Sequence, residues 1–356
     1  IPYLSAAKEL KTKPTQHSVK TLMESGVQAD ILVCRTEHEL RQGIREKLAR
    51  FCNVNSDCVI QSLDVNTIYD VPNYMYREGL DKVVLKKLKL EYSEPNLKSW
   101  NLFLERYKNP KGSVKIGLIG KYIELQDSYK SILESFIHAG AINEVGVEVV
   151  PVHSEHLNSG NVHEKLRFFD GVLVAPGFGE RGVEGKIEAI KYVRLNRIPF
   201  FGICYGMQMA VIEYSRNVLN FSDANSTEVN PNTKHPVIDL MENQKNIINK
   251  GGTMRLGTWE CSLKENSLCH SIYESNKINE RHRHRYELNN KYLSKLQDNG
   301  LIASGINDET NLVEVVEIKD HPWFVGVQYH PEYQSTVSSP HPLFVSFIKA
   351  AIKNNI

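Results

Sequence analysis

Residues 199–214 of the chain are PFFGICYGMQMAVIEY, a short apolar run followed by Cys204 between two glycines and then by a second apolar run. The first run has the length of a buried strand, and the second, from Tyr205 to Tyr214, favours a core helix. A strand that turns directly into a helix strains its central residue, and glycines on either side let the two elements approach closely. The stretch therefore predicts a cysteine held out above the edge of a sheet.

Strand-like and helix-like segments alternate along the chain from residue 113, which is typical of a parallel sheet covered by helices. This predicts an α/β fold with an open, mostly parallel sheet and helices on both faces. Strands are expected at 114–119, 147–152, 171–174, 199–203, 311–318 and 323–329, and helices at 127–140, 186–195, 205–214 and from 341 onward. The asparagine-rich residues 221–255 favour loops and short strands over the site.

The chain divides into two blocks by pattern. Residues 1–95 form a first domain with helices expected at 18–25 and 39–51 and a strand at 31–34, residues 96–112 form a linker, and residues 113–356 form the second domain. Because the sequence opens at Ile1 in mid-pattern, we expect it to be a piece of a longer chain.

Composition excludes several classes of protein. The 43 lysines and arginines balance 42 acidic residues, which argues against a general nucleic-acid or membrane-surface binder. The six cysteines form no C-x-x-C pair, so neither a zinc ribbon nor a disulfide framework is indicated. No apolar run is long enough to span a bilayer, and no signal-peptide pattern opens the chain. We therefore expect a cytoplasmic protein.

Cys204 is a candidate nucleophile. The N-terminus of the following helix favours a thiolate, and the backbone N–H of Tyr205 points at the reaction centre as half of an oxyanion hole. The second donor is expected from the loop Ala175-Pro176-Gly177 at a neighbouring strand end, where Pro176 has no N–H and Gly177 does. The alternative is a buried structural cysteine at the end of a strand.

His330, Pro331 and Glu332 follow the last expected strand directly. Residues two apart in an extended chain face the same way, so Glu332 can fix the tautomer of an imidazole that serves Cys204. The alternative is a surface His-Pro turn. Strand ends at one edge of an open α/β sheet bring such groups together, which favours the catalytic interpretation.

A family resemblance adds to these inferences. The motifs APGFGERGVEGK, GICYGMQMAVIEY, ANSTE, GGTMRLG, ERHRHRYELNN and QYHPE, in this order, resemble the glutaminase domain of the CTP synthases. The preceding KTKPTQHSVK, DILVCR and LARFCNV resemble the end of the synthetase domain of that family. The resemblance covers essentially the whole chain, and it implies a class I glutamine amidotransferase fold, flavodoxin-like, behind part of a P-loop-type α/β synthetase domain.

The resemblance implies glutamine hydrolysis by Cys204, His330 and Glu332, and transfer of ammonia to a second site where UTP, activated by ATP, becomes CTP. It carries glutamine contacts to Gly177, Tyr205, Gly206, Met207, Gln208, Glu228 and Arg285. A carboxylate suits the ammonium of an amino acid and a guanidinium suits its carboxylate, although Glu228 and Arg285 alone would be interpreted as surface charges.

The same resemblance implies nucleotide contacts in the first domain. It places the triphosphate of UTP or of the inhibitor CTP on Lys11, Thr12, Lys13, Pro14, Thr15, Gln16 and Lys47, and the ATP adenine against Leu63–Val65. Solvated lysines are the alternative for Lys11 and Lys13. The family further implies Mg²⁺, GTP as an allosteric activator, and a homo-tetramer.

Two features differ from the family pattern. The family's Pro-Gly-Gly-Phe-Gly is Ala-Pro-Gly-Phe-Gly here, which leaves one fewer glycine in the loop around Gly177. No G-x-x-x-x-G-K-[ST] occurs, and Gly120-Lys121 lacks the first glycine of such a loop. We therefore expect this stretch to hydrolyse glutamine but not to make CTP by itself, with ATP and Mg²⁺ handled mainly by other residues of the parent enzyme.

Other functions remain as alternatives. RHRHR at 281–285 suggests a nucleic-acid patch or a metal site, but alternation along a strand would put the arginines on one face and the two histidines on the other. A stand-alone Cys-His peptidase or γ-glutamyl hydrolase would share the cysteine turn and the base, but it has no use for KTKPTQ. A non-catalytic assembly module is a third alternative.

Overall fold

The computed structural model describes residues 1–124, 126–240 and 254–355, and the chain separates into two compact units, Ile1–Lys98 and Ser99–Ile356. The division falls inside the segment interpreted as a linker. Most of that segment forms helix α5 (Lys98–Lys108), so it is not an irregular connection. The division into functional domains stays a prediction.

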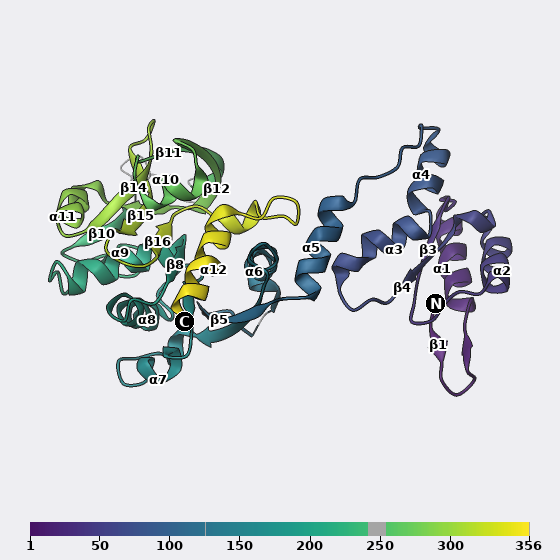
Figure 1. Cartoon of the computed structure of the whole chain (residues 1–356), viewed down its shortest axis with the longest axis horizontal. Helices are drawn as coiled ribbons and strands as arrows, with labels where there is room; N and C mark the ends of the chain where they lie inside the picture. Colours follow the sequence, from purple (N-terminus) through teal and green to yellow (C-terminus); the bar gives the residue numbers. More distant parts are fainter. Residues whose placement is uncertain (125, 241–253, 356) are drawn as a thin grey trace. The chain divides into compact units, whose positions relative to one another are not determined.

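The larger unit is built on a nine-stranded sheet, counted over the described residues (Figure 1). Five of its strands run parallel: β6 (Val145–His153), β5 (Gly112–Gly120), β7 (Gly171–Val174), β8 (Phe200–Ile203) and β16 (Phe324–Val327), in this order across the sheet. β7 and β8 are buried at every position, as expected for strands covered on both faces. The predicted parallel α/β architecture is confirmed.

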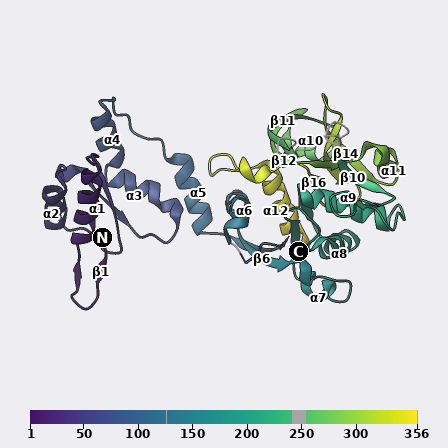
Figure 2. The same ribbon diagram turned by 180° about the vertical axis from the view of Figure 1, so that it is seen from behind.

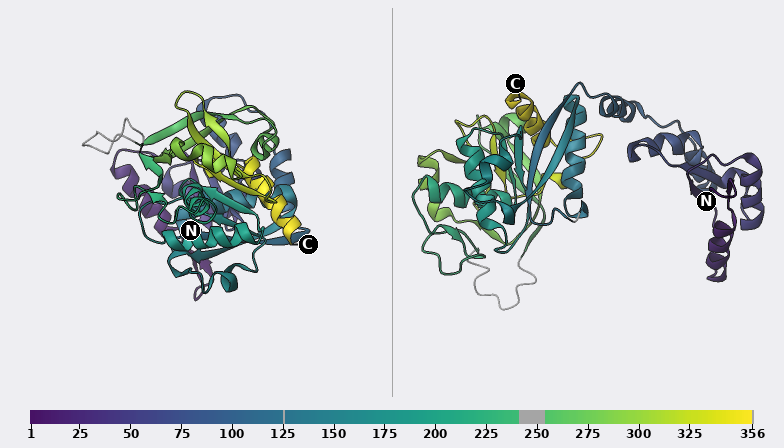
Figure 3. Two further views of the ribbon diagram at one scale, coloured as in Figure 1. Left: turned by 90° about the vertical axis from the view of Figure 1, so that its left-hand side faces the viewer. Right: turned by 90° about the horizontal axis from the view of Figure 1, so that it is seen from below.

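Helices cover both faces of the parallel strands (Figures 2 and 3). On one face α8 (Val183–Leu195) and α9 (Tyr205–Asn217) pack into one apolar cluster, and on the other α6 (Lys130–Asn143) and α12 (Pro342–Asn354) pack into a second. Residues 205–215 of α9 are all buried, which explains why most of them are apolar, although Gln208 and Glu213 are buried among them. Each predicted helix of this unit therefore has a counterpart within a few residues.

The sheet continues beyond β16 with four strands that are each antiparallel to the one before, and the sequence predicts them only in part. β15 (Leu312–Ile318) was predicted, whereas β11 (Arg255–Leu263) and β14 (Leu301–Asn307) were not. The outermost strand, β12 (Lys277–His284), contains most of RHRHR. The remaining short helices are α7 (Val162–Leu166), α10 (Leu268–Tyr273) and α11 (Leu293–Asp298).

Residues 221–255 were expected to form loops and short strands. The described part contains β9 (Asn225–Ser226) and β10 (Pro236–Leu240), which pair with each other, and β10 also pairs with β13 (Tyr286–Leu288). The rest of this expectation, at 241–253, lies outside the described residues.

The smaller unit has a parallel pair of strands, β3 (Leu32–Thr36) and β4 (Val59–Leu63), next to α1 (Lys13–Glu24) and α2 (Gln42–Cys52). A short hairpin of β1 (Tyr3–Leu4) and β2 (Glu9–Leu10) precedes them, and α3 (Val71–Arg77) and α4 (Leu80–Leu88) follow. None of the helices in the described ranges is both long enough and apolar enough to cross a lipid bilayer.

Candidate active site

Cys204 lies at the junction of β8 and α9, on the turn that the sequence predicts. Its backbone has φ 51° and ψ −101°, a conformation that residues other than glycine rarely adopt. A Cβ added at Gly202 would lie 2.8 Å from the carbonyl carbon of Gly206, and one added at Gly206 would overlap the carbonyl oxygen of Val174. Both glycines are therefore required by the close approach of strand and helix.

His330 reaches Cys204 from the neighbouring strand. Ile203 of β8 is paired in parallel with Val327 of β16, and the backbone N–H of Cys204 donates to the carbonyl of Val327 at 2.7 Å. Three residues beyond Val327, the Nδ1 atom of His330 lies 2.8 Å from Oε1 of Glu332. The thiol, the imidazole and the carboxylate thus converge at one edge of the sheet, as the sequence predicts.

The electrostatic surroundings keep His330 protonated. Burial alone would lower the pKa of this imidazole, but the nearby sulfur of Cys204 and the carboxylate of Glu332 both favour the charged ring and raise its pKa well above the usual value. Cys204, His330 and Glu332 are each only 5% exposed. A buried imidazolium between a sulfur and a carboxylate is the arrangement that stabilises a thiolate nucleophile.

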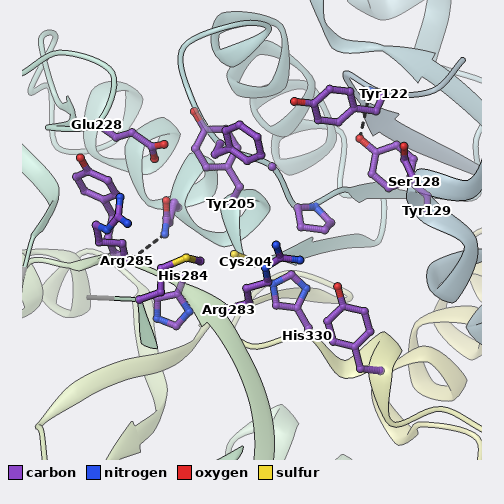
Figure 4. A pocket seen from close by; sticks show the side chains of 17 residues that line it. Tyr122, Ser128, Tyr129, Cys204, Tyr205, Glu228, Arg283, His284, Arg285 and His330 are labelled. Atoms are coloured by element: carbon purple, nitrogen blue, oxygen red, sulfur yellow. Dashed lines mark hydrogen bonds between the residues drawn. The ribbon is translucent and has the colours of Figure 1, made fainter. Parts of the chain in front are cut away.

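A pocket of about 500 Å³ opens over Cys204. It lies outside the carboxyl ends of β5 and β7, where the chain order across the sheet changes direction because β6 and β7 flank β5 on opposite sides. Open α/β sheets bind their ligands at such a position. In Figure 4 Glu228 and Arg285 lie at one end of this pocket and Tyr122, Ser128 and Tyr129 at the other, with Cys204 between them.

The structure brings together most of the predicted glutamine contacts. Gly177, Tyr205, Gln208, Glu228 and Arg285 all line the pocket with Cys204 and His330. Gly206 and Met207 do not line it: Gly206 packs against Val174, and the side chain of Met207 is buried in the core.

Gln208 already has protein partners. Its Nε2 donates to the carbonyl of Tyr286 at 2.9 Å and to Oε1 of Gln328 at 3.2 Å, and Nε2 of Gln328 lies 3.8 Å from the sulfur of Cys204. Gln208 and Gln328 therefore connect the first turn of α9 to β13 and to the segment that carries His330.

Several residues at the pocket were missed by the sequence analysis. The tyrosines Tyr122, Tyr129 and Tyr286 and the side chain of Arg283 line it, and the buried Lys186 lies beneath it. Residues 121–129 follow β5 directly, so the rule that ligands bind outside the carboxyl ends of strands would have indicated them as pocket residues. Lys186 is within APGFGERGVEGK but appeared there only as part of a helix.

The predicted nucleotide residues lie in the smaller unit. Thr12 is buried and its hydroxyl accepts a hydrogen bond from Nε2 of Gln16 at 3.1 Å, while Lys11 pairs with Glu9. The side chains of Lys13, Pro14 and Lys47 are exposed, those of Thr15 and Val65 are partly exposed, and Val65 follows β4 by two residues. The predicted contacts of these residues with UTP, CTP or ATP stay predictions.

The RHRHR segment alternates as expected for a strand. Arg281 and Arg283 are exposed, whereas His282 and His284 are buried. The buried side of the segment meets a polar cluster, in which Arg255 forms an ion pair with Glu314 and Nε2 of His284 lies 2.7 Å from Oε1 of Glu287. Within the described ranges, no group of three or more histidine, cysteine or acidic side chains is placed to hold a metal ion.

Comparison with known families gives two matches along the chain. Residues 124–350 match the family described as "Glutamine amidotransferase class-I", and residues 1–90 match the family described as "CTP synthase N-terminus". Among solved structures, one described as the glutaminase domain of Trypanosoma brucei CTPS with bound acivicin is 40% identical, with a TM-score of 0.64. The similarity covers 67% of this chain and 94% of that one.

Curated relatives extend the similarity over both units. A protein of Christiangramia forsetii named CTP synthase is 68% identical over 357 residues, and one of Flavobacterium johnsoniae with the same name is 67% identical over 353 residues. The matches cover 100% and 99% of this chain. The chain spans 65% and 66% of the lengths of these two relatives.

Proposed function

The chain belongs to the class-I glutamine amidotransferase family, and on that premise we propose that its larger unit hydrolyses glutamine to glutamate and ammonia. One observation carries the proposal: Cys204 stands on a strained strand-to-helix turn, beside a His330–Glu332 pair from the adjacent strand, in a pocket that also holds an acidic and a basic side chain. Cys204 is the nucleophile, His330 the acid and base, and Glu332 the group that orients the imidazole.

The first half of the reaction forms a thioester. The thiolate of Cys204 attacks the side-chain amide carbon of glutamine, and the backbone N–H groups of Tyr205 and Gly177 stabilise the oxyanion that forms. The imidazolium of His330 gives its proton to the leaving nitrogen, so ammonia departs and the Cys204 thioester remains. Glu332 holds Nδ1 of the ring, which leaves Nε2 for this transfer.

The second half releases glutamate. His330, now neutral, takes a proton from water as the water attacks the thioester carbon. The same two backbone donors stabilise the second oxyanion. The bond to sulfur then breaks, glutamate leaves, and the thiolate and imidazolium are restored.

The two ends of the amino acid suit the two charged side chains in the pocket. We assign the substrate ammonium to Glu228 and its α-carboxylate to Arg285, since both line the pocket away from Ser128 and Tyr129. Gln208 and Tyr205 would form the floor beneath the side-chain amide. If Gly206 and Met207 contact glutamine, we propose that they do so through their backbone atoms at the start of α9.

For the parent protein we propose CTP synthase activity, in which the ammonia aminates UTP at the expense of ATP. Support comes from the names of the curated relatives and from the match of residues 1–90 to a CTP synthase N-terminus. That match favours a synthase over a stand-alone γ-glutamyl hydrolase, a peptidase or an assembly module. Lys11 to Gln16 and Lys47 would bind the triphosphate of UTP or CTP, and Val65 would lie at the ATP adenine.

The remaining elements of the proposal concern the whole enzyme. It includes Mg²⁺ with ATP, GTP as an activator, a homo-tetramer, and a cytoplasmic location. The part of the chain that the structure describes offers no acidic cluster for Mg²⁺, so we assign no ligand to the ion here.

The test is a glutaminase assay on Cys204→Ala. Ammonia release should be abolished while the circular dichroism spectrum stays that of the wild type, because the variant loses only the attacking sulfur. Cys269→Ala removes another buried thiol of the same unit and serves as the matched control. Release that persists in Cys204→Ala, or that is lost equally in Cys269→Ala, would contradict the assignment of the nucleophile.

A further inference from the structure

The loop between β7 and α8, which carries Gly177, is held by polar side chains. Its aromatic residue, Phe178, is 64% exposed and so does little to anchor it. At the start of the loop, the ammonium of Lys186 donates to the carbonyl of Ala175 at 3.2 Å. The position of Gly177 therefore depends on the polar groups on either side of it.

At the far end of the loop, the peptide group between Phe178 and Gly179 is bonded through both its carbonyl and its N–H. Nζ of Lys121 donates to the carbonyl of Phe178, and the N–H of Gly179 in the same peptide donates to Oε1 of Glu228 at 2.9 Å. The hydroxyl of Tyr205 then donates to the carbonyl of Gly179. At the end nearer to Gly177, the N–H of the buried Ala175 donates to the carbonyl of Ile119 at 2.9 Å, and Lys186 adds a side-chain hydrogen bond to the carbonyl of Ala175.

Lys186 has an unusual environment for an ammonium. It is 0% exposed, its Nζ lies 4.8 Å from the ring centroid of Tyr205, and a Cβ at residue 177 would lie 3.4 Å from that Nζ. Within the described part of the chain, no carboxylate lies at ion-pair distance from it. A buried ion costs several kcal/mol unless an opposite charge compensates it, and the nearby group that favours the charged form of Lys186 is Cys204.

One lysine thus contacts both segments that supply the proposed oxyanion donors. It bonds to the strand end that leads to Gly177, and it lies over the ring of Tyr205, the residue after the nucleophile. It also supplies positive charge near the place where negative charge appears, first on sulfur and then on the substrate oxygen. Positive charge of this kind favours both species without being consumed.

We propose that Lys186 is a positioning residue for glutamine hydrolysis: it holds the Ala175 carbonyl so that the Gly177 N–H faces Cys204, and it stabilises the thiolate. The inference rests on the proposed function and adds a residue that neither touches the substrate nor belongs to the Cys204, His330 and Glu332 set. The role requires both the hydrogen bond and the charge.

The charge on Lys186 is sensitive to pH. Burial, followed by the nearby charge of Lys121, lowers its pKa to about 7, and the proximity of Cys204 opposes this shift. Lys121 faces Lys186 from the end of β5, and Cys204 and Tyr205 face it from the start of α9. As the pH rises through neutrality the charge is lost, while the neutral amine still donates to Ala175.

The experiment compares Lys186→Met, Lys186→Arg and the control Lys191→Met, which changes a partly exposed lysine of the same helix. Two rates are measured against pH: glutamine hydrolysis, and alkylation of Cys204 by iodoacetamide. Lys186→Met should lower kcat about 10- to 100-fold with KM little changed, because a displaced donor weakens only the transition state. Alkylation at mildly acidic pH should fall about tenfold, since the thiolate loses a nearby charge.

Lys186→Arg keeps the charge at every pH, so the inflection near neutrality should disappear from its profile of kcat/KM. This variant carries the test if Lys186→Met does not fold. Wild-type rates in a folded Lys186→Met, equal losses in Lys191→Met, or an unchanged inflection in Lys186→Arg would each overturn the role of Lys186. Wild-type protein that releases no ammonia, but whose Cys204 alkylation depends on Lys186, would contradict the proposed function and still support the arrangement around Cys204.

Discussion

The α-carbon of Gly206 lies directly against the carbonyl oxygen of Val174, so that any side chain at residue 206 would overlap it. The two residues belong to α9 and to β7, and their contact brings the first turn of the helix down onto the sheet. This contact, together with the one between Gly202 and Gly206, holds Cys204 in its strained conformation. The geometry of the nucleophile therefore depends on two residues that carry no functional group.

Gly206→Ala should impair both stability and activity. The added methyl group overlaps the backbone of Val174 and forces α9 to move, which costs about 1–3 kcal/mol of the free energy of unfolding. The accompanying shift of Cys204 should reduce glutamine hydrolysis about 100-fold. Urea unfolding and ammonia release measure the two effects. Gly146→Ala is the control, because its Cβ would meet nothing nearer than 3.7 Å, and a variant at 206 that behaves like it would refute the packing argument.

Glu332→Gln should leave the fold intact and lower kcat by about 10³- to 10⁴-fold. The amide removes the charge that favours the imidazolium and no longer selects the correct tautomer of His330. Because Glu332 helps raise the pKa of His330, the acidic form of the ring should also be lost at a lower pH in the variant. The pH profile of kcat measures both consequences. An exposed acid, Glu309, changed to glutamine provides the control, and a kcat within tenfold of the wild type would argue against the role of Glu332.

Two substitutions of Glu228 should separate substrate binding from loop positioning. Glu228→Gln keeps an acceptor for the N–H of Gly179 but loses the charge for the substrate ammonium, so KM for glutamine should rise about 10- to 100-fold at similar kcat. Glu228→Ala loses the acceptor as well, so kcat should fall in addition. Steady-state kinetics distinguish the two variants, and equal kinetic parameters would show that the bond to Gly179 has no effect on the reaction.

His321 should make the stability of the larger unit depend on acidic pH. Burial lowers the pKa of this imidazole to about 4, and Nδ1 accepts from the N–H of Trp323 at 3.3 Å. The unfolded histidine protonates at about 6.5, so its stabilising contribution is complete above that pH and is lost as the pH falls toward 4, by about 3 kcal/mol.

His321→Asn keeps the acceptor but does not titrate. Its deficit in the free energy of unfolding relative to the wild type should therefore shrink as the pH falls from about 7 to about 4. Urea unfolding over this range measures the difference. The exposed His156, changed to asparagine, should give no such trend, and a constant deficit for His321→Asn would mean that this imidazole does not titrate as described.

The parallel half of the sheet could be predicted because its strands are apolar runs with clear boundaries. β7 and β8 are buried at every position. The glycines two residues before and after Cys204 predict the close approach of strand and helix that the structure shows. His330 and Glu332 could be placed because parallel strands end at the same edge of a sheet.

The antiparallel strand β12 could not be identified in the same way, because most of its buried residues are not apolar. The inward positions of β12 after Ile278 are Glu280, His282 and His284, so the alternation concerns burial and not hydropathy. Such side chains are tolerated inside because they pair, as His284 does with Glu287. Only the tertiary structure supplies these partners.

Lys121 and Lys186 were missed for a related reason. Lys121 was considered only as part of an incomplete phosphate loop, and Lys186 only as a helical residue. Each acts on a backbone carbonyl of the loop around Gly177, which is distant from Lys121 in the chain. No residue type or spacing in a sequence predicts a hydrogen bond from a side chain to a remote backbone carbonyl.

β8 and β16 are immediate neighbours in the ladder, and this adjacency has a consequence for how such a protein can change. The pairing of β8 with β16 sets the separation between the sulfur of Cys204 and the imidazole of His330. The long stretch between these two residues therefore begins and ends at fixed positions on the sheet. The part of that stretch between the end of α9 and the start of β16 can therefore change in length or composition without altering the separation between Cys204 and His330. Because this part also carries Glu228 and Arg285, changes there would alter substrate preference before they alter the reaction itself.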